Sequence, residues 1–448
     1  MLDLISAHPE SKAPPICRRR MFSPEGGALK TSSFFLWFDA TAMVKEMNSE
    51  TLRVGDIVEI TTERLTYGGD AIARHEGLAI FVPFAAPDEK LRVRIIERKN
   101  RFARATIEQI VEPSPSRREP PCKYFGDCGG CQLQHLDYST QLESKTRFVR
   151  DALERIAQIR WPDKIVIRSA NEFGYRGRAQ LKIDPRRRRI GFNRAASNDI
   201  CDVETCAVLV PELEEALHSL RSTIENRTAT NESRTFRSQI EIAAGDDRVA
   251  FEPAIENLQG GPVRRSVGQY VYNFSASTFF QGNIELLAAL IDEAVGHQSG
   301  KLAVDLYAGV GLFTIPLGRT FERVIGVEGS ETASRFASQN IAENGAGNVE
   351  FHTSSVESWL KNAVDNKFAS PDLLLLDPPR AGASEALSNM IALRPSNIVY
   401  VSCDPATLAR DLKSLTAEGY GLSQVTAIDL FPQTYHVETV ATLKRSVR

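Results

Sequence analysis

The sequence lacks the features that mark a membrane, secreted or repeat protein. No apolar stretch approaches the ~18 residues that a spanning helix needs, and the longest, LAIFVPFAAP, contains two prolines. The first residues show no basic start followed by an apolar block, as a secretory signal would. No internal repeat is visible. These absences favour a cytoplasmic globular protein, and 448 residues predict two or three domains.

Cysteine is scarce and unevenly placed. The seven cysteines include a tight group, Cys122, Cys128 and Cys131, and a looser pair, Cys201 and Cys206. Cys403 stands far from all of them. An odd, uneven set argues against a disulfide framework and favours metal binding or catalysis.

Basic residues are concentrated in two stretches, although the net charge is only −3. Residues 90–104 contain seven lysines and arginines against one acid, and residues 160–194 contain eleven against three. Such stretches suit a phosphate backbone, but they are equally typical of a solvated face. The pattern therefore leaves nucleic-acid binding open.

Local patterns divide the chain into four regions. Residues 1–48 show no sustained period, which predicts a disordered extension. Residues 49–112 contain short β-branched runs between turn residues, typical of a small five-stranded barrel of the OB type. Residues 113–270 predict a mixed α+β domain with a helix from about Tyr138. In residues 271–448 helices and strands alternate, which predicts a doubly wound α/β domain that binds ligands at the carboxyl ends of its strands.

The first chemical motif is VDLYAGVGLFTIPL. Asp305 ends a predicted strand, Gly309 and Gly311 lie in the turn after it, and Glu328 ends the next strand. Glycines let the backbone approach a ligand closely, and the acid is placed to bind ribose hydroxyls. The third glycine of a dinucleotide site is missing, which favours S-adenosylmethionine over NAD. A tight turn without a ligand is the alternative.

Three more motifs lie at predicted strand ends. Asp377 of LLLLDPPR is held by two prolines, where it could accept hydrogen bonds from a nitrogenous ring or simply belong to a loop. Cys403 of VSCDPATLARDL precedes a helix whose dipole would lower the thiol pKa, so it is either a nucleophile or a structural cysteine. Glu438 of FPQTYHVETV is either a paired structural carboxylate or a buried base.

These residue types together suit methylation of an unactivated pyrimidine carbon. Uracil C5 is a poor nucleophile, but attack of a thiolate on C6 generates an enolate that can accept a methyl group. A base must then remove the C5 proton and expel the thiol.

The four motifs DLYAGVGLFTIPL, LDPPR, VSCDPATLARDL and FPQTYHVETV, in this order, resemble those of the RNA 5-methyluridine (uracil-C5) methyltransferases. The resemblance covers about residues 50–448 and implies a TRAM barrel followed by a Rossmann-like methyltransferase domain. It implies Cys403 as the nucleophile and Glu438 as the base. The implied S-adenosylmethionine site contains Gln281, Tyr307, Glu328 and Asp377, the last also contacting the target uracil.

The resemblance also gives an interpretation of CKYFGDCGGC. Ribosomal-RNA members of the family carry a [4Fe–4S] cluster on C-x5-C-x2-C and one distant cysteine. The implied ligands are Cys122, Cys128, Cys131 and Cys206. Thiolates at this spacing suit zinc equally well, and Cys201 competes for the fourth position.

RNA is the expected partner, with 23S rRNA as the first candidate and the tRNA T-loop as the alternative, and we expect a monomer.

Two other functional classes compete. A cluster-bearing redox or radical enzyme is disfavoured because C-x5-C-x2-C differs from the C-x3-C-x2-C common in radical enzymes. A non-catalytic RNA-binding module leaves the Cys, Asp and Glu motifs unexplained.

Overall fold

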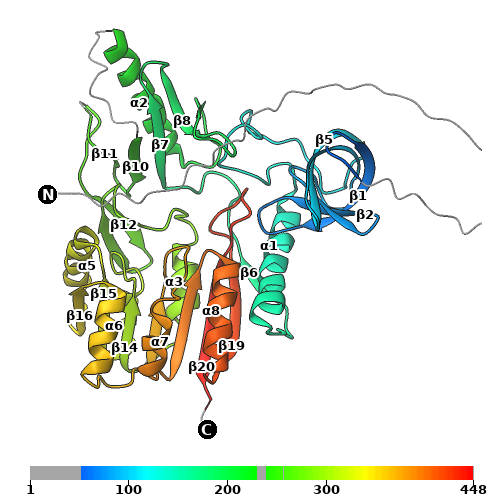
Figure 1. Cartoon of the computed structure of the whole chain (residues 1–448). Coiled ribbons are helices and arrows are strands. Elements are labelled where there is room, and N and C mark those ends of the chain that lie inside the picture. The colour runs from blue at the N-terminus through cyan, green and yellow to red at the C-terminus, as the bar shows by residue number, and fades with distance from the viewer. Residues whose placement is uncertain (1–51, 230–238, 256, 447–448) are drawn as a thin grey trace, which may run out of the picture. The chain divides into compact units, whose positions relative to one another are not determined.

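The computed structural model describes residues 52–229, 239–255 and 257–446. The expected disordered extension at residues 1–48 lies outside these residues. Within them the strands form a closed barrel, a five-stranded sheet, a two-stranded hairpin and an eight-stranded sheet (Figure 1). No helix in the described ranges is long and apolar enough to cross a membrane.

The barrel confirms the predicted five-stranded N-terminal domain. Its strands pair in the order β1-β2-β3-β5-β4. Alternate residues of β4, Leu91, Val93 and Ile95, are buried inside it, as the two-residue period of a strand requires. The strands are β1 (Ile57–Leu65), β2 (Ala71–His75), β3 (Leu78–Val82), β4 (Lys90–Arg98) and β5 (Phe102–Glu112).

An antiparallel sheet in the order β11-β10-β7-β8-β9 follows. Helix α2 (Pro211–Ala229) packs Leu213 and Leu217 against Ile240 and Ile242 of this sheet. The strands are β7 (Arg178–Asp184), β8 (Arg189–Asn193), β9 (Ile200–Asp202), β10 (Gln239–Ala244) and β11 (Val249–Glu252). The hairpin of β12 (Val263–Val267) and β13 (Tyr270–Phe274) leads into the last sheet.

The eight-stranded sheet has the order β16-β15-β14-β17-β18-β20-β19-β6. The run from β16 to β18 is parallel, whereas β20 is antiparallel to both of its neighbours. The order reverses between β14 and β17, where open α/β sheets bind ligands. The strands are β6 (Val166–Arg168), β14 (Gly300–Leu306), β15 (Phe321–Glu328), β16 (Val349–Thr353), β17 (Leu373–Leu376), β18 (Asn397–Ser402), β19 (Tyr420–Ile428) and β20 (Glu438–Arg445).

Both faces of this sheet are buried under helices (Figure 1). In β17, Leu373 and Leu375 pack on the face of α3, while Leu374 and Leu376 pack on the face of α6 and α8. A strand buried on both faces needs such a continuous apolar run. The helices are α3 (Leu287–Val295), α4 (Thr314–Leu317), α5 (Glu331–Glu343), α6 (Val356–Asp365), α7 (Leu387–Ala392) and α8 (Pro405–Ala417).

Three elements that complete this domain come from upstream of residue 271. The three-residue strand β6 pairs in parallel with β19 at the edge of the sheet. Helix α1 (Tyr138–Ala152) and the π-helical turn η1 (Leu153–Ala157) bury Val149 and Leu153 in the same core as α8. These residues cover apolar surface and a strand edge that would otherwise be exposed.

A buried ion pair fixes α1 to the segment after β19. Lys145 Nζ lies 2.5 Å from Asp429 Oδ1, and both side chains are fully buried. The Tyr138 hydroxyl donates to the other Asp429 oxygen at 2.9 Å, and Lys145 also donates to the Phe431 carbonyl at 2.9 Å. Burial lowers the pKa of Lys145, which the carboxylate of Asp429 opposes.

We expect Lys145→Met to lower the free energy of unfolding by about 3–5 kcal/mol, because it leaves the Asp429 carboxylate buried without its cation. Urea denaturation measures this loss. Lys145→Met combined with Asp429→Asn should recover part of the stability, since the uncompensated charge is then gone. A double variant no more stable than the single one would contradict this account.

Candidate functional site

A pocket of about 650 Å³ lies at the carboxyl edge of the eight-stranded sheet. Cys403 directly follows β18, and Glu438 is the first residue of β20. Because β20 runs antiparallel, its first residue lies at the edge where β18 ends, and Ser402 pairs with Thr439. The thiol and the carboxyl group therefore face one pocket from neighbouring strands.

The structure brings together every residue predicted for catalysis and cofactor binding. All six line this pocket: Gln281, Tyr307, Glu328, Asp377, Cys403 and Glu438. They come from different strand ends and one loop. This agrees with the rule that open α/β sheets bind ligands at the carboxyl ends of their strands. Their chemical roles remain predictions.

At one end of the pocket the backbone holds the carboxylate of Glu328. Its Oε2 accepts from the Gly309 N–H at 2.9 Å, and its Oε1 accepts from the Ser330 N–H at 2.7 Å. Gly309 has a φ of +56°, and an added Cβ would meet no atom within 4 Å, so the backbone conformation favours glycine there. Each Glu328 oxygen keeps a lone pair for a hydroxyl donor.

Asp377 as a whole is half-buried, but its carboxyl group is fully enclosed. Burial raises the pKa of Asp377 to about 7, and the Gln281 amide, which donates to Oδ2 at 3.2 Å, opposes this rise. Burial also raises the pKa of Asp305, one strand away, to about 7. The Thr314 hydroxyl donates to Asp305 at 2.5 Å. Two neighbouring carboxyl groups at this edge thus have pKa values raised by burial.

The expectation that the helix after Cys403 lowers its thiol pKa is wrong for the protein without ligands. Burial, followed by the charge of Glu438, raises the pKa of Cys403 to about 11, although Arg380 opposes the rise. The first amides of α8 are already occupied, because Asp404 Oδ1 accepts from the N–H groups of Ala406 and Thr407 at 2.9 and 3.0 Å. The negative charge of the Asp404 cap therefore offsets part of the positive end of the α8 dipole, which the prediction had assigned to the thiolate.

Glu438 is 1% exposed, and its Oε1 has no hydrogen-bond partner. Burial, together with the charge of Asp377, raises the pKa of Glu438 well above its ordinary value. A buried carboxyl group that lines a pocket and lacks a hydrogen-bond partner is costly for stability alone. Such a group favours a functional role over a structural one.

Arg380 is a site residue that had no predicted role. It lines the pocket, and its charge lowers the pKa of both Cys403 and Glu438. Its Nη2 lies 3.4 Å from His436 Nε2, and burial followed by the charge of Arg380 lowers the pKa of His436 to about 4. The signal for Arg380 was its place directly after the two prolines of LDPPR.

The four cysteines implied as cluster ligands line a second pocket. Cys201 does not line it, and its thiol instead donates to Asp127 Oδ2 at 3.4 Å. Burial raises the pKa of Cys131 to about 12 and that of Cys206 to about 11. In the described ranges, no group of three or more His, Cys, Asp or Glu side chains has the arrangement of a metal site.

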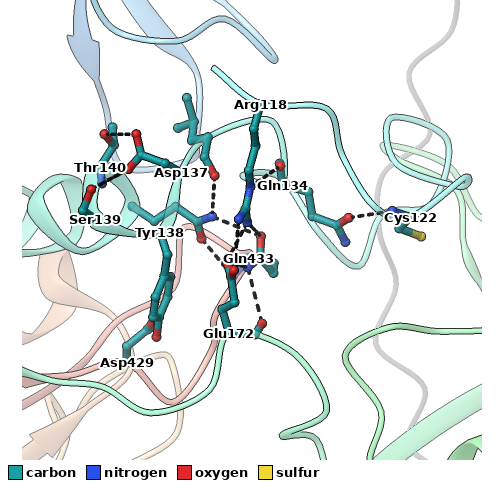
Figure 2. Close-up of polar contacts among 12 residues, drawn as sticks. Arg118, Cys122, Gln134, Asp137, Tyr138, Ser139, Thr140, Glu172, Asp429 and Gln433 are labelled. Carbon is teal, nitrogen blue, oxygen red and sulfur yellow. Dashed lines mark hydrogen bonds and ion pairs between the residues drawn. The ribbon is translucent and has the colours of Figure 1, made fainter. Parts of the chain in front are cut away.

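A polar network joins the cysteine loop, residues 118–134, to the segment that leads into Glu438 (Figure 2). Arg118 pairs with Glu172 at 3.0 and 2.7 Å, and Gln433 Nε2 donates to the same carboxylate at 3.0 Å. The N–H of Cys122 donates to Gln134 Oε1 at 3.2 Å. Gln433 is fully buried, so its contacts fix the backbone five residues before Glu438.

Comparison with known proteins shows which proteins this chain is similar to. The sequence profile described as tRNA (Uracil-5-)-methyltransferase matches residues 262–446, and the TRAM domain profile matches residues 51–107. An uncharacterized RNA methyltransferase of Aquifex aeolicus is 34% identical, with 86% of this chain and 98% of the relative covered. The 23S rRNA (uracil(1939)-C(5))-methyltransferase RlmD of Cronobacter sakazakii is 33% identical, with 87% and 96% covered.

The chain belongs to the RNA uracil-C5 methyltransferase family.

A solved structure supports the fold of this methyltransferase over most of its length. The tRNA (uracil-54, C5)-methyltransferase of Pyrococcus abyssi, in complex with S-adenosyl-L-homocysteine, is 27% identical with a TM-score of 0.67. The match covers 86% of this chain and 100% of that protein. The predicted TRAM barrel and C-terminal methyltransferase fold are thereby confirmed.

The raised pKa of Cys403 predicts slow alkylation of this methyltransferase by iodoacetamide near pH 7. Because the thiolate reacts, the rate should rise about tenfold per pH unit up to the pKa. Arg380→Met removes a charge that lowers this pKa, so its profile should move to higher pH. Mass spectrometry of the Cys403 peptide measures the rate, and Arg394→Met, at the opposite end of the sheet, is the control. An unmoved profile in Arg380→Met would contradict the assigned effect of Arg380.

Proposed function

We propose that the protein transfers a methyl group from S-adenosylmethionine to C5 of a uridine in RNA through a covalent adduct between Cys403 and uracil C6. One observation carries the proposal: the pairing of Ser402 with Thr439 brings Cys403 and Glu438 to one pocket with Asp377. The pocket offers a nucleophile, a base and a polar group that can bind the ring.

In the first step, the Cys403 thiol loses its proton to water and the Sγ–C6 bond forms. The electrons of the uracil C5=C6 bond move to the O4 enolate, which makes C5 nucleophilic. Arg380 favours the thiolate by its charge, and it opposes the burial that keeps the thiol protonated. Asp377, held by Gln281, accepts a hydrogen bond from the uracil ring and orients it.

When bound, S-adenosylmethionine supplies an electrophilic methyl group on a sulfonium cation, whose charge favours ionised Glu438. After C5 is methylated, Glu438 accepts the C5 proton, the C5=C6 bond reforms, and the Sγ–C6 bond breaks to release the thiolate. Because Glu438 is buried, water is kept from this position, so the enolate is protected from protonation until it takes the methyl group.

The residues at the other end of the pocket fit the cosubstrate. Glu328 has free lone pairs for ribose hydroxyls, and Tyr307 and Gln281 line the same pocket as Glu328 and Asp377. A volume of about 650 Å³ is within the range of sites for cofactor-sized ligands.

For the substrate we propose 23S rRNA, with the tRNA T-loop as the alternative. Curated relatives at 33% identity are named as 23S rRNA methyltransferases, whereas the solved tRNA enzyme is 27% identical. We assign residues 49–112 to the barrel, 113–270 to a central domain with an RNA-binding face, and 271–448 to methyl transfer, except that α1, η1 and β6 of the central segment pack onto the methyl-transfer sheet. The turn between β7 and β8 exposes Arg186, Arg187 and Arg188, which suits RNA phosphates.

We expect Cys403→Ala to lower turnover at least about 10³-fold, because no adduct can form. Glu438→Gln should instead accumulate a methylated protein–RNA adduct that survives denaturing electrophoresis, because the C5 proton is not removed. Labelled methyl transfer to 23S rRNA and tRNA transcripts measures turnover and separates the two substrates. Glu350→Gln, an exposed carboxylate on β16, is the control. Full activity in Cys403→Ala would refute the mechanism.

We also propose that Cys122, Cys128, Cys131 and Cys206 hold a [4Fe–4S] cluster. The support is a donor set of four cysteines that line one pocket. Thiolate donors suit a sulfur-ligated metal. A cluster here would cross-link the cysteine loop to the segment before α2, and zinc is the alternative occupant.

Anaerobically purified protein should contain about four iron and four sulfide per chain. Cys206→Ser should lose most of the iron, whereas Cys201→Ser should retain it, because only Cys206 lines the pocket. Metal analysis and sulfide determination measure both variants. A content of about one zinc and no sulfide per chain would show that zinc, and not the cluster, occupies the site. Loss of iron in Cys201→Ser alone would refute the ligand set.

A further inference from the structure

The β1–β2 loop of the barrel reaches the catalytic sheet. This loop, residues 66–70, is closed by backbone bonds from Thr66 to Asp70 and from Gly69 to Thr66, at 2.9 and 3.0 Å. Gly69 is buried with a φ of +93°, and an added Cβ would lie 3.3 Å from Gln132 Cβ and 3.7 Å from the Tyr435 ring. The loop therefore packs closely against the cysteine loop and the segment before Glu438.

Tyr67, at the tip of this loop, contacts the residue after the nucleophile. Its hydroxyl donates to Asp404 Oδ2 at 3.1 Å. Its ring packs edge-on against Tyr435 at 5.4 Å and against Phe148 at 6.0 Å. Because two aromatic contacts hold the ring, the direction of the hydroxyl group is set by packing.

The two carboxylate oxygens of Asp404 accept hydrogen bonds from different parts of the protein. Oδ1 caps α8 by accepting from two N–H groups, and Oδ2 accepts from Tyr67. On the other side of Cys403, the Ser402 hydroxyl bonds to the Asp404 backbone N–H and C=O at 3.2 Å each. The backbone that carries the thiol is thus fixed from both sides, and one of its restraints comes from the barrel.

We propose that Tyr67 is a positioning residue for the nucleophile: its hydrogen bond holds the Asp404 carboxylate in the capping orientation and partly offsets its negative charge beside Cys403. The proposal rests on the proposed role of Cys403. It gives the barrel a part in the chemical step in addition to any contact with RNA.

The electrostatics agree with this geometry. Burial raises the pKa of Tyr67, the charge of Asp404 adds to the rise, and Cys403 is among the smaller contributors. The charged groups with the largest influence on the pKa of the thiol are Glu438, Arg380 and Asp377. A negative charge near the thiol that loses a hydrogen-bond donor will oppose thiolate formation more strongly.

The test uses the full-length chain and a double-mutant cycle of Tyr67→Phe and Asp404→Ser. Phenylalanine removes only the hydroxyl group. Serine keeps an oxygen that can cap α8 but has no second oxygen for Tyr67. The cycle therefore isolates the Tyr67–Asp404 contact.

Tyr67→Phe should lower kcat about three- to tenfold, the effect of losing one hydrogen bond to a charged group. The Kd for RNA should stay within about twofold, since the contact lies inside the protein. The alkylation profile of Cys403, measured without RNA, should move to higher pH. In the Asp404→Ser background, Tyr67→Phe should have no further effect on either readout.

Ile80→Val is the matched control, because Ile80 is fully buried in the barrel. It removes a methylene group from the barrel core without touching Asp404, so it should reduce stability and leave kcat unchanged. If it lowered kcat to the same degree, Tyr67 would act only through barrel stability, and the proposal would be overturned.

Three other results would also overturn it. These are an unchanged kcat in Tyr67→Phe, a loss of RNA affinity alone, or an equal loss in the presence and absence of Asp404. Failure of the proposed function is a separate result, because methylation by Cys403→Ala would refute the nucleophile. The alkylation profile would still report whether Tyr67 acts on the thiol.

Discussion

The register of one antiparallel strand pair determines the chemistry available in this protein. Ser402 pairs with Thr439, so the residues at the edge, Cys403 and Glu438, meet in one pocket. A slip of one residue would turn the side chains of β20 to the opposite face of the sheet and remove the carboxyl group from the thiol. The Lys145–Asp429 ion pair and the network around Gln433 hold the segment that leads into β20, and so they protect this register.

The burial that brings the proposed nucleophile and the proposed base together also raises their pKa values. Cys403 and Glu438 both have raised pKa values, because each loses water and each is near other acids. Arg380 is the charge in the pocket that opposes this effect. If Cys403 is the nucleophile, as we propose, its raised pKa limits its reaction with other electrophiles.

The sequence predicted the barrel and the α/β domain because alternating or continuous apolar runs mark their strands, as in β4 and β17. Strand ends also predicted that Cys403, Asp377 and the Gly309 turn would share one cleft, whereas Gln281 and Tyr307 were named only through the family resemblance; all of them line the one pocket. The pKa of Cys403 was not predictable, because it depends on burial and on the charges of Glu438, Arg380 and Asp377, which only the fold brings near the thiol. The strand β6, Val-Ile-Arg, is too short to carry a pattern, and nothing near Tyr67 in the sequence indicates its partner 337 residues away.

The position of α1 and β6 limits how this protein can be divided or recombined. The catalytic sheet is finished by residues that precede the central antiparallel sheet in the chain, so the central sheet is in effect an insertion into the catalytic domain. A fragment that begins at residue 271 would expose the edge of β19 and the apolar surface that α1 covers, and such surfaces promote aggregation. Exchange of the barrel and central sheet between relatives would preserve the catalytic domain only if residues 138–168 stayed with it.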